Sequence, residues 1–167
     1  MVNYLPVIEA HLIGCCSRGL ADKLFEITGN NQERLHIYGI NKFVLFEEII
    51  IFYVRGNWTA GSALFPPSPH YIYKELTKPF EYMIAGIPII CSDFPVWKRL
   101  IDTTGAGICV DSSDVKKGIN AIEYLNANKE EAEQMGSNGR ASVEKFYKWE
   151  NEALKLHQLY RELAMES

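Results

Sequence analysis

Residues 77–88 carry the side chains whose types and spacing are best suited to chemistry. Lys78 and Glu81 lie three residues apart in a segment with a helical pattern, so both project from one face of the predicted helix. A helix N-terminus presents free N–H groups and a partial positive charge, and the Lys78 ammonium adds a full charge in the same turn, which suits a phosphate. The Glu81 carboxylate can accept both hydroxyls of a ribose. Together they predict a site for a nucleoside diphosphate.

The same two residues also have a simpler interpretation. At this spacing, Lys78 and Glu81 can form an ordinary ion pair on a solvated helix face, which contributes about 0.3 kcal/mol. Cationic helix starts are common, so the residue types alone leave both interpretations open.

The helix that would position Lys78 and Glu81 has a sequence signal at each end. Thr77 is an acceptable N-cap, and Pro79 is tolerated in a first turn because its missing N–H is not needed there. Gly86 is placed for a left-handed C-cap, and Pro88 prevents continuation. These signals predict a helix over residues 78–85.

Short apolar runs alternate with helical patterns along the rest of the chain. The runs are continuous, as expected of strands covered on both faces, and occupy residues 12–13, 35–38, 49–54, 63–65, 87–91 and 107–110. Helical patterns follow residue 114, extend over residues 132–146 and follow residue 149. The alternation predicts a single α/β domain, residues 1–167, with a Rossmann-like, mostly parallel sheet and helices on both faces. Residues 1–60 fit this pattern less clearly.

Charge and hydropathy exclude other classes of function. The chain of 167 residues has a net charge of −4, without the basic face that nucleic-acid binding requires. The N-terminus has no basic region before an apolar run, so no signal peptide is predicted. The most apolar stretch, residues 43–54, is too short to span a bilayer and is expected to be a buried strand region.

No metal or disulfide framework is predicted from the remaining reactive side chains. The cysteines form no CxxC or Cys/His pattern, and a reduced, cytoplasmic compartment fits them best. Asp111 and Asp114 are explained by a loop before a helix N-cap. The histidines have no sequence partner that suggests a catalytic triad, and only His70, in a proline-rich loop, is retained as a functional candidate; the set is His11, His36, His70 and His157.

From residue 77 onward the sequence is similar to the donor-binding segment of group 1 (family 4) glycosyltransferases. The resemblance begins at residues 77–88, written TKPFEYMIAGIP, and keeps its order and spacing through residues 89–97, 105–110, 121–122, 135–140 and 147–149. It implies a GT-B fold, in which two Rossmann-like domains face each other across a cleft, and it identifies this chain as the C-terminal domain that binds the nucleotide sugar.

The resemblance also implies an activity and a set of partners. The activity is transfer of a sugar from a nucleotide-diphosphate donor with retention of configuration and without an essential metal or other cofactor. The N-terminal acceptor domain is absent from residues 1–167, so the expected partner is such a domain or a separate chain, with peripheral membrane association through that missing half. The acceptor remains open.

Several residues acquire roles from the same resemblance. Lys78 would stabilise the leaving diphosphate and is the catalytic candidate, with Thr77 beside it at the helix start, and Glu81 would hold the ribose. In the family another Glu precedes this position by eight residues and touches the transferred sugar. That position is Tyr73 here, and Glu75 is out of register. A loop from His70 to Thr77 that uses backbone amides is an alternative way to hold the sugar.

The family's glycine turn and basic pair have only a distant match. Gly14, with Arg18 and Lys23, is the nearest counterpart for the diphosphate, although its spacing is shorter than usual and solvated surface charge is the competing explanation. Two other functions stay open: a non-catalytic nucleotide-sugar-binding or partner subunit, and a nucleotide-sugar epimerase on the same fold. Residues 78–88, together with residues 92–95, resemble the transferases more than the epimerases.

Overall fold

The strands of the described chain are all parallel but belong to two separate sheets. The computed structural model describes residues 3, 8–74 and 76–165. One sheet pairs β1 (Ala10–Cys16) with β2 (Leu35–Ile40), and the other has the order β3 (Gly61–Ala63), β4 (Ile89–Ser92), β5 (Gly107–Val110). The predicted strands near these positions are therefore confirmed, whereas the sheet is divided.

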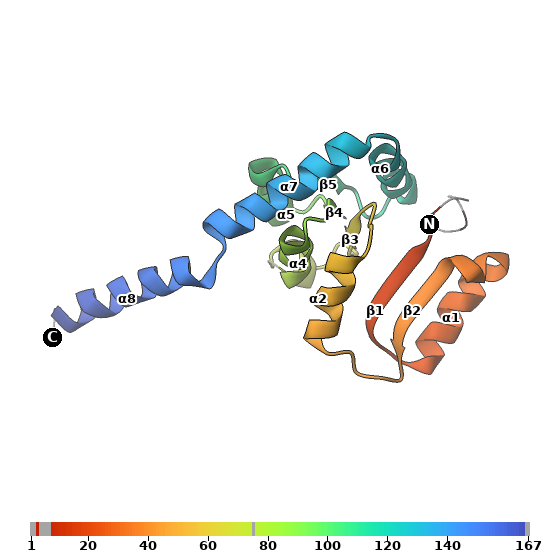
Figure 1. Ribbon diagram of the computed structural model, residues 1–167, viewed down its shortest axis with the longest axis horizontal. Coiled ribbons are helices and arrows are strands. Elements are labelled where there is room, and N and C mark those ends of the chain that lie inside the picture. Colours follow the sequence, from red (N-terminus) through yellow and green to blue (C-terminus); the bar gives the residue numbers. More distant parts are fainter. Residues whose placement is uncertain (1–2, 4–7, 75, 166–167) are drawn as a thin grey trace.

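Helices connect the strands in the order expected of an α/β chain (Figure 1). In chain order the helices are α1 (Arg18–Thr28), the 3-10 helix η1 (Gly29–Arg34), α2 (Phe46–Arg55), α3 (Pro69–Ile72), α4 (Thr77–Ala85), α5 (Pro95–Thr104), α6 (Val115–Ala127), α7 (Lys129–Phe146) and α8 (Trp149–Met165). The helices predicted after residue 114, over 132–146 and after 149 are confirmed.

The segment at residues 49–54, predicted as a strand, is helical and belongs to α2. A continuous apolar run of this length cannot by itself distinguish a strand from a buried helix segment. Polar end signals decide the outcome: Glu47 and Glu48 lie in the first turn, Arg55 lies in the last, and the Leu45 N–H donates to Glu48 Oε2 at 3.0 Å. The expected buried strand over residues 43–54 is therefore wrong.

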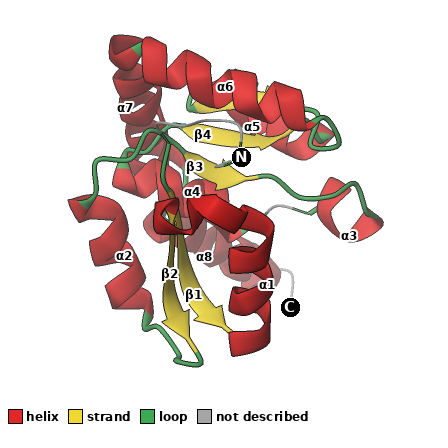
Figure 2. Cartoon of the chain, turned by 90° about the vertical axis from the view of Figure 1, so that its right-hand side faces the viewer, coloured by secondary structure: helices red, strands yellow, loops and turns green. Residues whose placement is uncertain are grey.

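The main core lies on both faces of the sheet formed by β3, β4 and β5. Ile89 and Cys91 point to one face, where they pack with residues of α4, α5 and α7, including Met83 and Trp97. Ile90 points to the other face, where α6 and α7 supply Leu125 and other apolar side chains. Helices on both sides of this sheet are visible in Figure 2, so the predicted layering is confirmed here.

Close packing of α4 on α7 depends on small residues. A Cβ on Gly136 would lie 2.1 Å from the carbonyl oxygen of Gly86, so the helix backbone itself touches the end of α4. Gly86 adopts φ 72°, and its N–H and that of Ile87 bond to the Met83 and Tyr82 carbonyls. The predicted left-handed C-cap is confirmed, and it fixes where α4 ends against α7.

The sheet of β1 and β2 lies between α1 and α2 (Figure 1). The final helix, α8, extends away from the body in the same view, and none of its described residues is buried. Its predicted apolar face, which includes Leu156 and Tyr160, is exposed. Among the described helices, none is long and apolar enough to cross a membrane.

Candidate donor-binding site

The first turn of α4 lies at the carboxyl edge of the parallel strands. The chain leaves β3, returns through α4 and enters β4 parallel to β3, so α4 runs against the strand direction. In open α/β sheets this edge is where ligands bind. Leu76, rather than Thr77, occupies the N-cap position, and its apolar side chain makes no capping hydrogen bond. The predicted cap at Thr77 is therefore wrong: Thr77 is the first helical residue.

Lys78 and Glu81 project from one face of α4 and bind each other. Lys78 Nζ donates to Glu81 Oε2 at 2.8 Å and to the hydroxyl of Tyr53, on α2, at 3.2 Å. The ammonium also lies 5.7 Å from the centroid of the Tyr53 ring. The side chain of Glu81 is only 15% exposed and that of Lys78 37%. The pair is therefore partly buried beneath α2, unlike an ordinary surface ion pair.

Two tyrosines, Tyr53 and Tyr82, lie beside this ion pair. Burial, followed by the negative charge of Glu81, raises the pKa of Tyr53. Burial and then the neighbouring Tyr53 raise the pKa of Tyr82, whose hydroxyl donates to the Ser62 carbonyl at 3.3 Å. The two rings lie 5.2 Å apart. Both phenols thus stay neutral donors at physiological pH, next to a carboxylate that can accept from them or from a ligand.

Residues 77–142 match the family described as glycosyl transferases group 1. This part of the chain is similar to that family. The matched segment begins at the first residue of α4 and ends within α7, so it contains Lys78, Glu81, β4 and β5, whereas β3 lies before it. No curated protein sequence matches the chain.

A solved structure shows the same fold over nearly the whole chain. Sucrose-phosphate synthase from Thermosynechococcus elongatus superposes with a TM-score of 0.68 at 24% identity, over 94% of this chain and 39% of that chain. At this identity the likeness establishes the fold, and it confirms the predicted GT-B-type α/β architecture. The chain spans about two fifths of its structural neighbour.

The proline-rich loop before α4 is anchored to the group 1 segment by buried polar groups. Ser92, fully buried at the end of β4, bonds through Oγ to both the N–H and the carbonyl of Phe65 at 2.9 and 3.0 Å. The buried Trp97 donates from Nε1 to the carbonyl of Lys74 at 2.8 Å. These contacts hold both ends of residues 65–74, so the loop has a defined shape at the edge of the site.

Two predicted sugar-binding residues lie on this loop. His70 is exposed on α3, and its Nδ1 lies 3.5 Å from Lys74 Nζ. Tyr73, at the position of the family's first glutamate, follows α3 with 75% of its surface exposed. Glu75, the out-of-register alternative, lies outside the described residues. Neither His70 nor Tyr73 bonds to Lys78 or Glu81 in the described part of the chain.

The structure does not bring the predicted basic pair to α4. Gly14, with φ 142°, lies inside β1 at an irregularity in its pairing, and the turn is formed instead by Ser17, whose Oγ accepts from the Leu20 N–H at 3.3 Å. Arg18 begins α1 and Lys23 lies further along the same helix, both exposed. Figure 1 shows α1 and α4 on opposite sides of β1 and β2.

Tyr53 is a member of the site that the sequence did not reveal. Its hydroxyl is the second acceptor for Lys78, yet the residue falls in the run predicted as a strand and lies 25 positions upstream. The end signals of α2 could have placed Tyr53 on a helix, but nothing in the sequence places α2 against α4.

Proposed function

We propose that this chain is the donor-binding half of a glycosyltransferase that transfers a sugar from a nucleotide-diphosphate sugar with retention of configuration. The observation that carries the proposal is the partly buried contact of Lys78 with Glu81 and with Tyr53 of α2. Lys78 and Glu81 lie in the first turns of α4, where the segment that matches group 1 glycosyltransferases begins, whereas Tyr53 lies outside that segment. Its place at the carboxyl edge of a parallel sheet supports the same conclusion.

Lys78 supplies positive charge where the leaving group becomes more negative. As the bond between the anomeric carbon and the diphosphate oxygen breaks, the electron pair remains on the diphosphate, and a positioned ammonium at a helix N-terminus stabilises that charge. Lys78 Nζ lies 2.8 Å from Glu81 Oε2. A phosphate group would compete with Glu81 for the ammonium.

Glu81 would hold the ribose of the donor. One carboxylate oxygen, Oε2, accepts from Lys78, and a carboxylate has several further acceptor sites for the two ribose hydroxyls. With only 15% of its side chain exposed, Glu81 would make these charged hydrogen bonds in a partly desolvated environment. Glu81 therefore acts in the proposal by binding and orienting the donor.

The proposal requires no essential metal or cofactor. Mg²⁺-dependent sites for nucleotide sugars use carboxylate ligands, and the sequence around α4 has no Asp-x-Asp pair. The two acids at residues 111 and 114 are used locally: Asp111 accepts from Ser113 N, and Asp114 caps α6 by accepting from Lys116 N at 2.9 Å. Charge neutralisation is assigned to Lys78 and the helix N-terminus instead.

An acceptor-binding domain, in the same protein or on a partner chain, would complete the enzyme. The chain covers 39% of its structural neighbour. Exposed apolar side chains on the protruding helix α8, among them Leu159 and Tyr160, offer a surface for that domain. Membrane association, if the acceptor needs it, would come through that half, and a cytoplasmic location agrees with the free cysteines.

A non-catalytic nucleotide-sugar-binding subunit is a second candidate, and one observation favours it. The position at which the family's first glutamate touches the transferred sugar is Tyr73, whose side chain points into solvent with 75% exposure. Such a subunit would bind the nucleotide through Lys78 and Glu81 without transferring the sugar.

Calorimetric titration with UDP, ADP and GDP, each with and without EDTA, tests donor binding. We expect one of the three to bind, with an affinity that EDTA leaves unchanged, because Lys78 and the helix N-terminus supply the positive charge. Absence of binding by all three would contradict the proposed function, and binding that disappears in EDTA would contradict its metal independence.

A further inference from the structure

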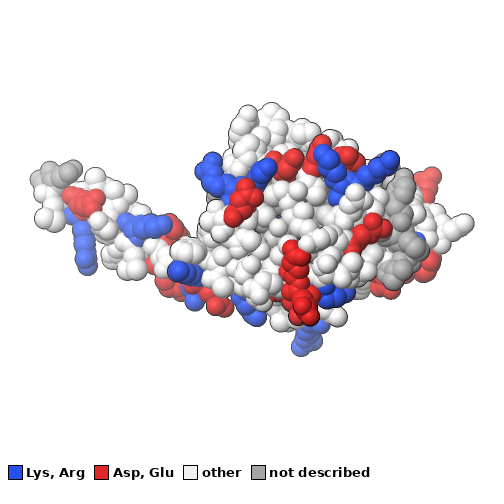
Figure 3. All heavy atoms as spheres, turned by 90° about the horizontal axis from the view of Figure 1, so that it is seen from above, with Lys and Arg blue, Asp and Glu red and all other residues white. Residues whose placement is uncertain are grey.

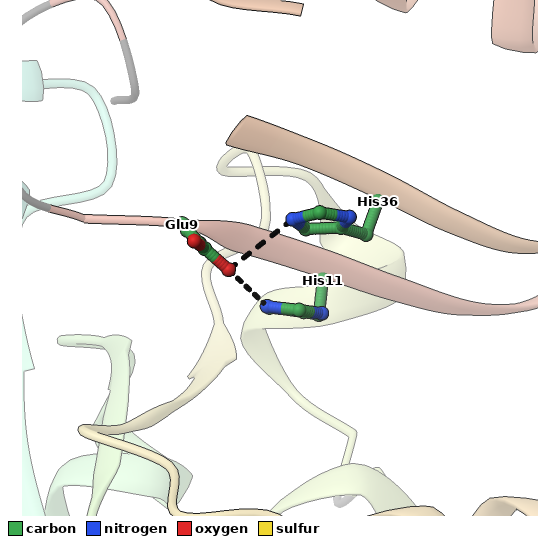
Figure 4. Close-up of side chains that lie close together, drawn as sticks. All are labelled: Glu9, His11 and His36. Carbon is green, nitrogen blue, oxygen red and sulfur yellow. Dashed lines mark ion pairs between the residues drawn. The ribbon is translucent and has the colours of Figure 1, made fainter. Parts of the chain in front are cut away.

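Three potential metal ligands meet on one face of β1 and β2, away from α4. Glu9 Oε2 lies 3.3 Å from His11 Nε2 and 3.2 Å from His36 Nε2 (Figure 4). All three ligand atoms lie within 4.8 Å of one another. Glu9 is close to His11 in the sequence, whereas the fold brings His36 to both of them.

Strand geometry explains why these side chains converge. Glu9 and His11 are two residues apart in extended chain, so they project to the same side. His11 and His36 are direct neighbours in the parallel register of β1 and β2. Their imidazole rings lie face to face, with centroids 4.4 Å apart. The backbone therefore brings the three donor side chains together on one face of the two strands.

Two of the three donor separations are close to those of a tetrahedral zinc site. With Zn–N and Zn–O bonds of about 2.0–2.2 Å, ligand atoms in a tetrahedron are separated by about 3.3–3.6 Å. The two separations from Glu9, 3.3 and 3.2 Å, are close to this range. The imidazole planes are inclined by only 18°, and they would turn toward each other on binding, because a metal lies in the plane of each ligand ring.

One nitrogen of the cluster lacks a hydrogen bond. His36 Nε2 is buried, and although it lies 3.2 Å from Glu9 Oε2, it has no hydrogen-bond partner in the part of the chain that the structure describes. A buried polar atom without a partner is costly, and a bound metal ion would satisfy it.

Neighbouring side chains fix the orientation of His11. Its other ring nitrogen, Nδ1, lies 3.3 Å from the Tyr38 hydroxyl, and the Trp58 ring packs edge-on at 5.0 Å. In the tautomer that donates from Nδ1 to the Tyr38 oxygen, the Nε2 lone pair is free to bind a metal. Glu9 is 58% exposed, which leaves the ion a path from solvent.

We propose that Glu9, His11 and His36 bind a Zn²⁺ ion that joins β1 to β2. Two imidazoles and one carboxylate form a donor set suited to Zn²⁺, with the fourth position open to solvent. The sheet of β1 and β2 has only two strands, so a bond from each strand to one ion would stabilise this part of the fold. The proposal is independent of donor binding at α4.

Calorimetric titration of the full chain with ZnCl₂ tests the site. We expect one Zn²⁺ per wild-type chain and a rise in the melting temperature with added Zn²⁺. Glu9→Gln and His36→Asn should each weaken binding by about 10- to 100-fold or more, since even loss of a supporting hydrogen bond has an effect of that size. Tyr38→Phe should weaken it by about 10-fold. His157→Asn, on α8, is the matched control and should bind as the wild type does.

Wild-type affinity in Glu9→Gln or His36→Asn would overturn the proposal, as would absence of Zn²⁺ binding by the wild type. Equal weakening in His157→Asn would also overturn it. If His36→Asn fails to fold by circular dichroism, Glu9→Gln decides, because that side chain is largely in solvent. Replacement of Zn²⁺ by Co²⁺ distinguishes a competing site at Cys15 and Cys16, which would give an intense thiolate-to-metal absorption band; its appearance would contradict the proposal.

Discussion

At the scale of residues, the spacing of Lys78 and Glu81 predicts their contact correctly, because it depends only on the helical repeat. The 2.8 Å ion pair confirms both the shared face and the pairing of the two residues. What the repeat cannot predict is the environment. Tyr53 comes from another helix, and its approach leaves Glu81 only 15% exposed. The tertiary contact thus converts a surface pair into a partly buried one.

The half-buried phenol of Tyr82 predicts a loss of stability in alkali. An unfolded tyrosine ionises near pH 10, whereas burial raises the pKa of Tyr82 in the folded state, so the unfolded chain releases this proton first. The stabilisation is complete below a pH of about 10 and decreases as the pH rises above it. Between pH 8 and pH 10.5, the free energy of unfolding measured with urea should decrease less in Tyr82→Phe than in the wild type.

Tyr160→Phe is the control for this comparison, because it removes the same hydroxyl from an exposed position on α8. Its decrease in unfolding free energy should equal that of the wild type. An equal decrease in Tyr82→Phe as well would show that the half-buried phenol is not responsible.

The metal-binding residues show a different limit at the same scale. Glu9 and His11 could be recognised as neighbours from their two-residue spacing, since that is the repeat of a strand. His36 could not, because its place beside His11 is set by the register of β1 against β2. Strand register depends on the packing of the whole sheet and cannot be predicted from the few residues around His36.

At the scale of elements, the residues that mark the ends of helices and strands predict several boundaries correctly. The Gly86 C-cap, Asp114 at the start of α6 and the strands β4 and β5 are confirmed. Two predictions failed for local reasons. The apolar run at residues 49–54 predicts a strand, but the helix signals at its ends prevail, and the N-cap predicted at Thr77 lies one residue earlier, at Leu76.

Gly136→Ala should destabilise the protein by about 1–2 kcal/mol. The added methyl group would meet the Gly86 carbonyl oxygen at 2.1 Å, which forces α7 away from α4, at a cost of about 1–3 kcal/mol. The higher helix propensity of alanine offsets part of this, by up to about 1 kcal/mol. Urea unfolding measures the difference. Ser137→Ala, at the next and exposed position of α7, should change stability by no more than about 0.5 kcal/mol. Equal stability of both variants would contradict this close packing.

At the scale of the whole molecule, the order of strands and helices follows from the sequence, but their division into sheets does not. The alternation predicts a parallel α/β chain, and the structural likeness confirms it. The strands β1 and β2 form a sheet of their own. The helix α1, which carries Arg18 and Lys23, lies on the opposite side of these two strands from α4 (Figure 1). On the face shown in Figure 3, basic and acidic side chains are interspersed. Charge for a diphosphate is therefore assigned to Lys78 and not to a broad basic surface.

The central claim is that Lys78 and Glu81 bind different parts of one donor. Calorimetry of the wild type, Lys78→Ala and Glu81→Ala, each with a nucleoside and its diphosphate, tests it most directly. Glu81→Ala should weaken both ligands by about tenfold or more, because hydrogen bonds to a charged group contribute about 1.5–3 kcal/mol. Lys78→Ala should weaken the diphosphate much more than the nucleoside. Equal affinities in all three proteins would contradict the account, since a pair with a purely structural role would change stability and leave binding unaltered.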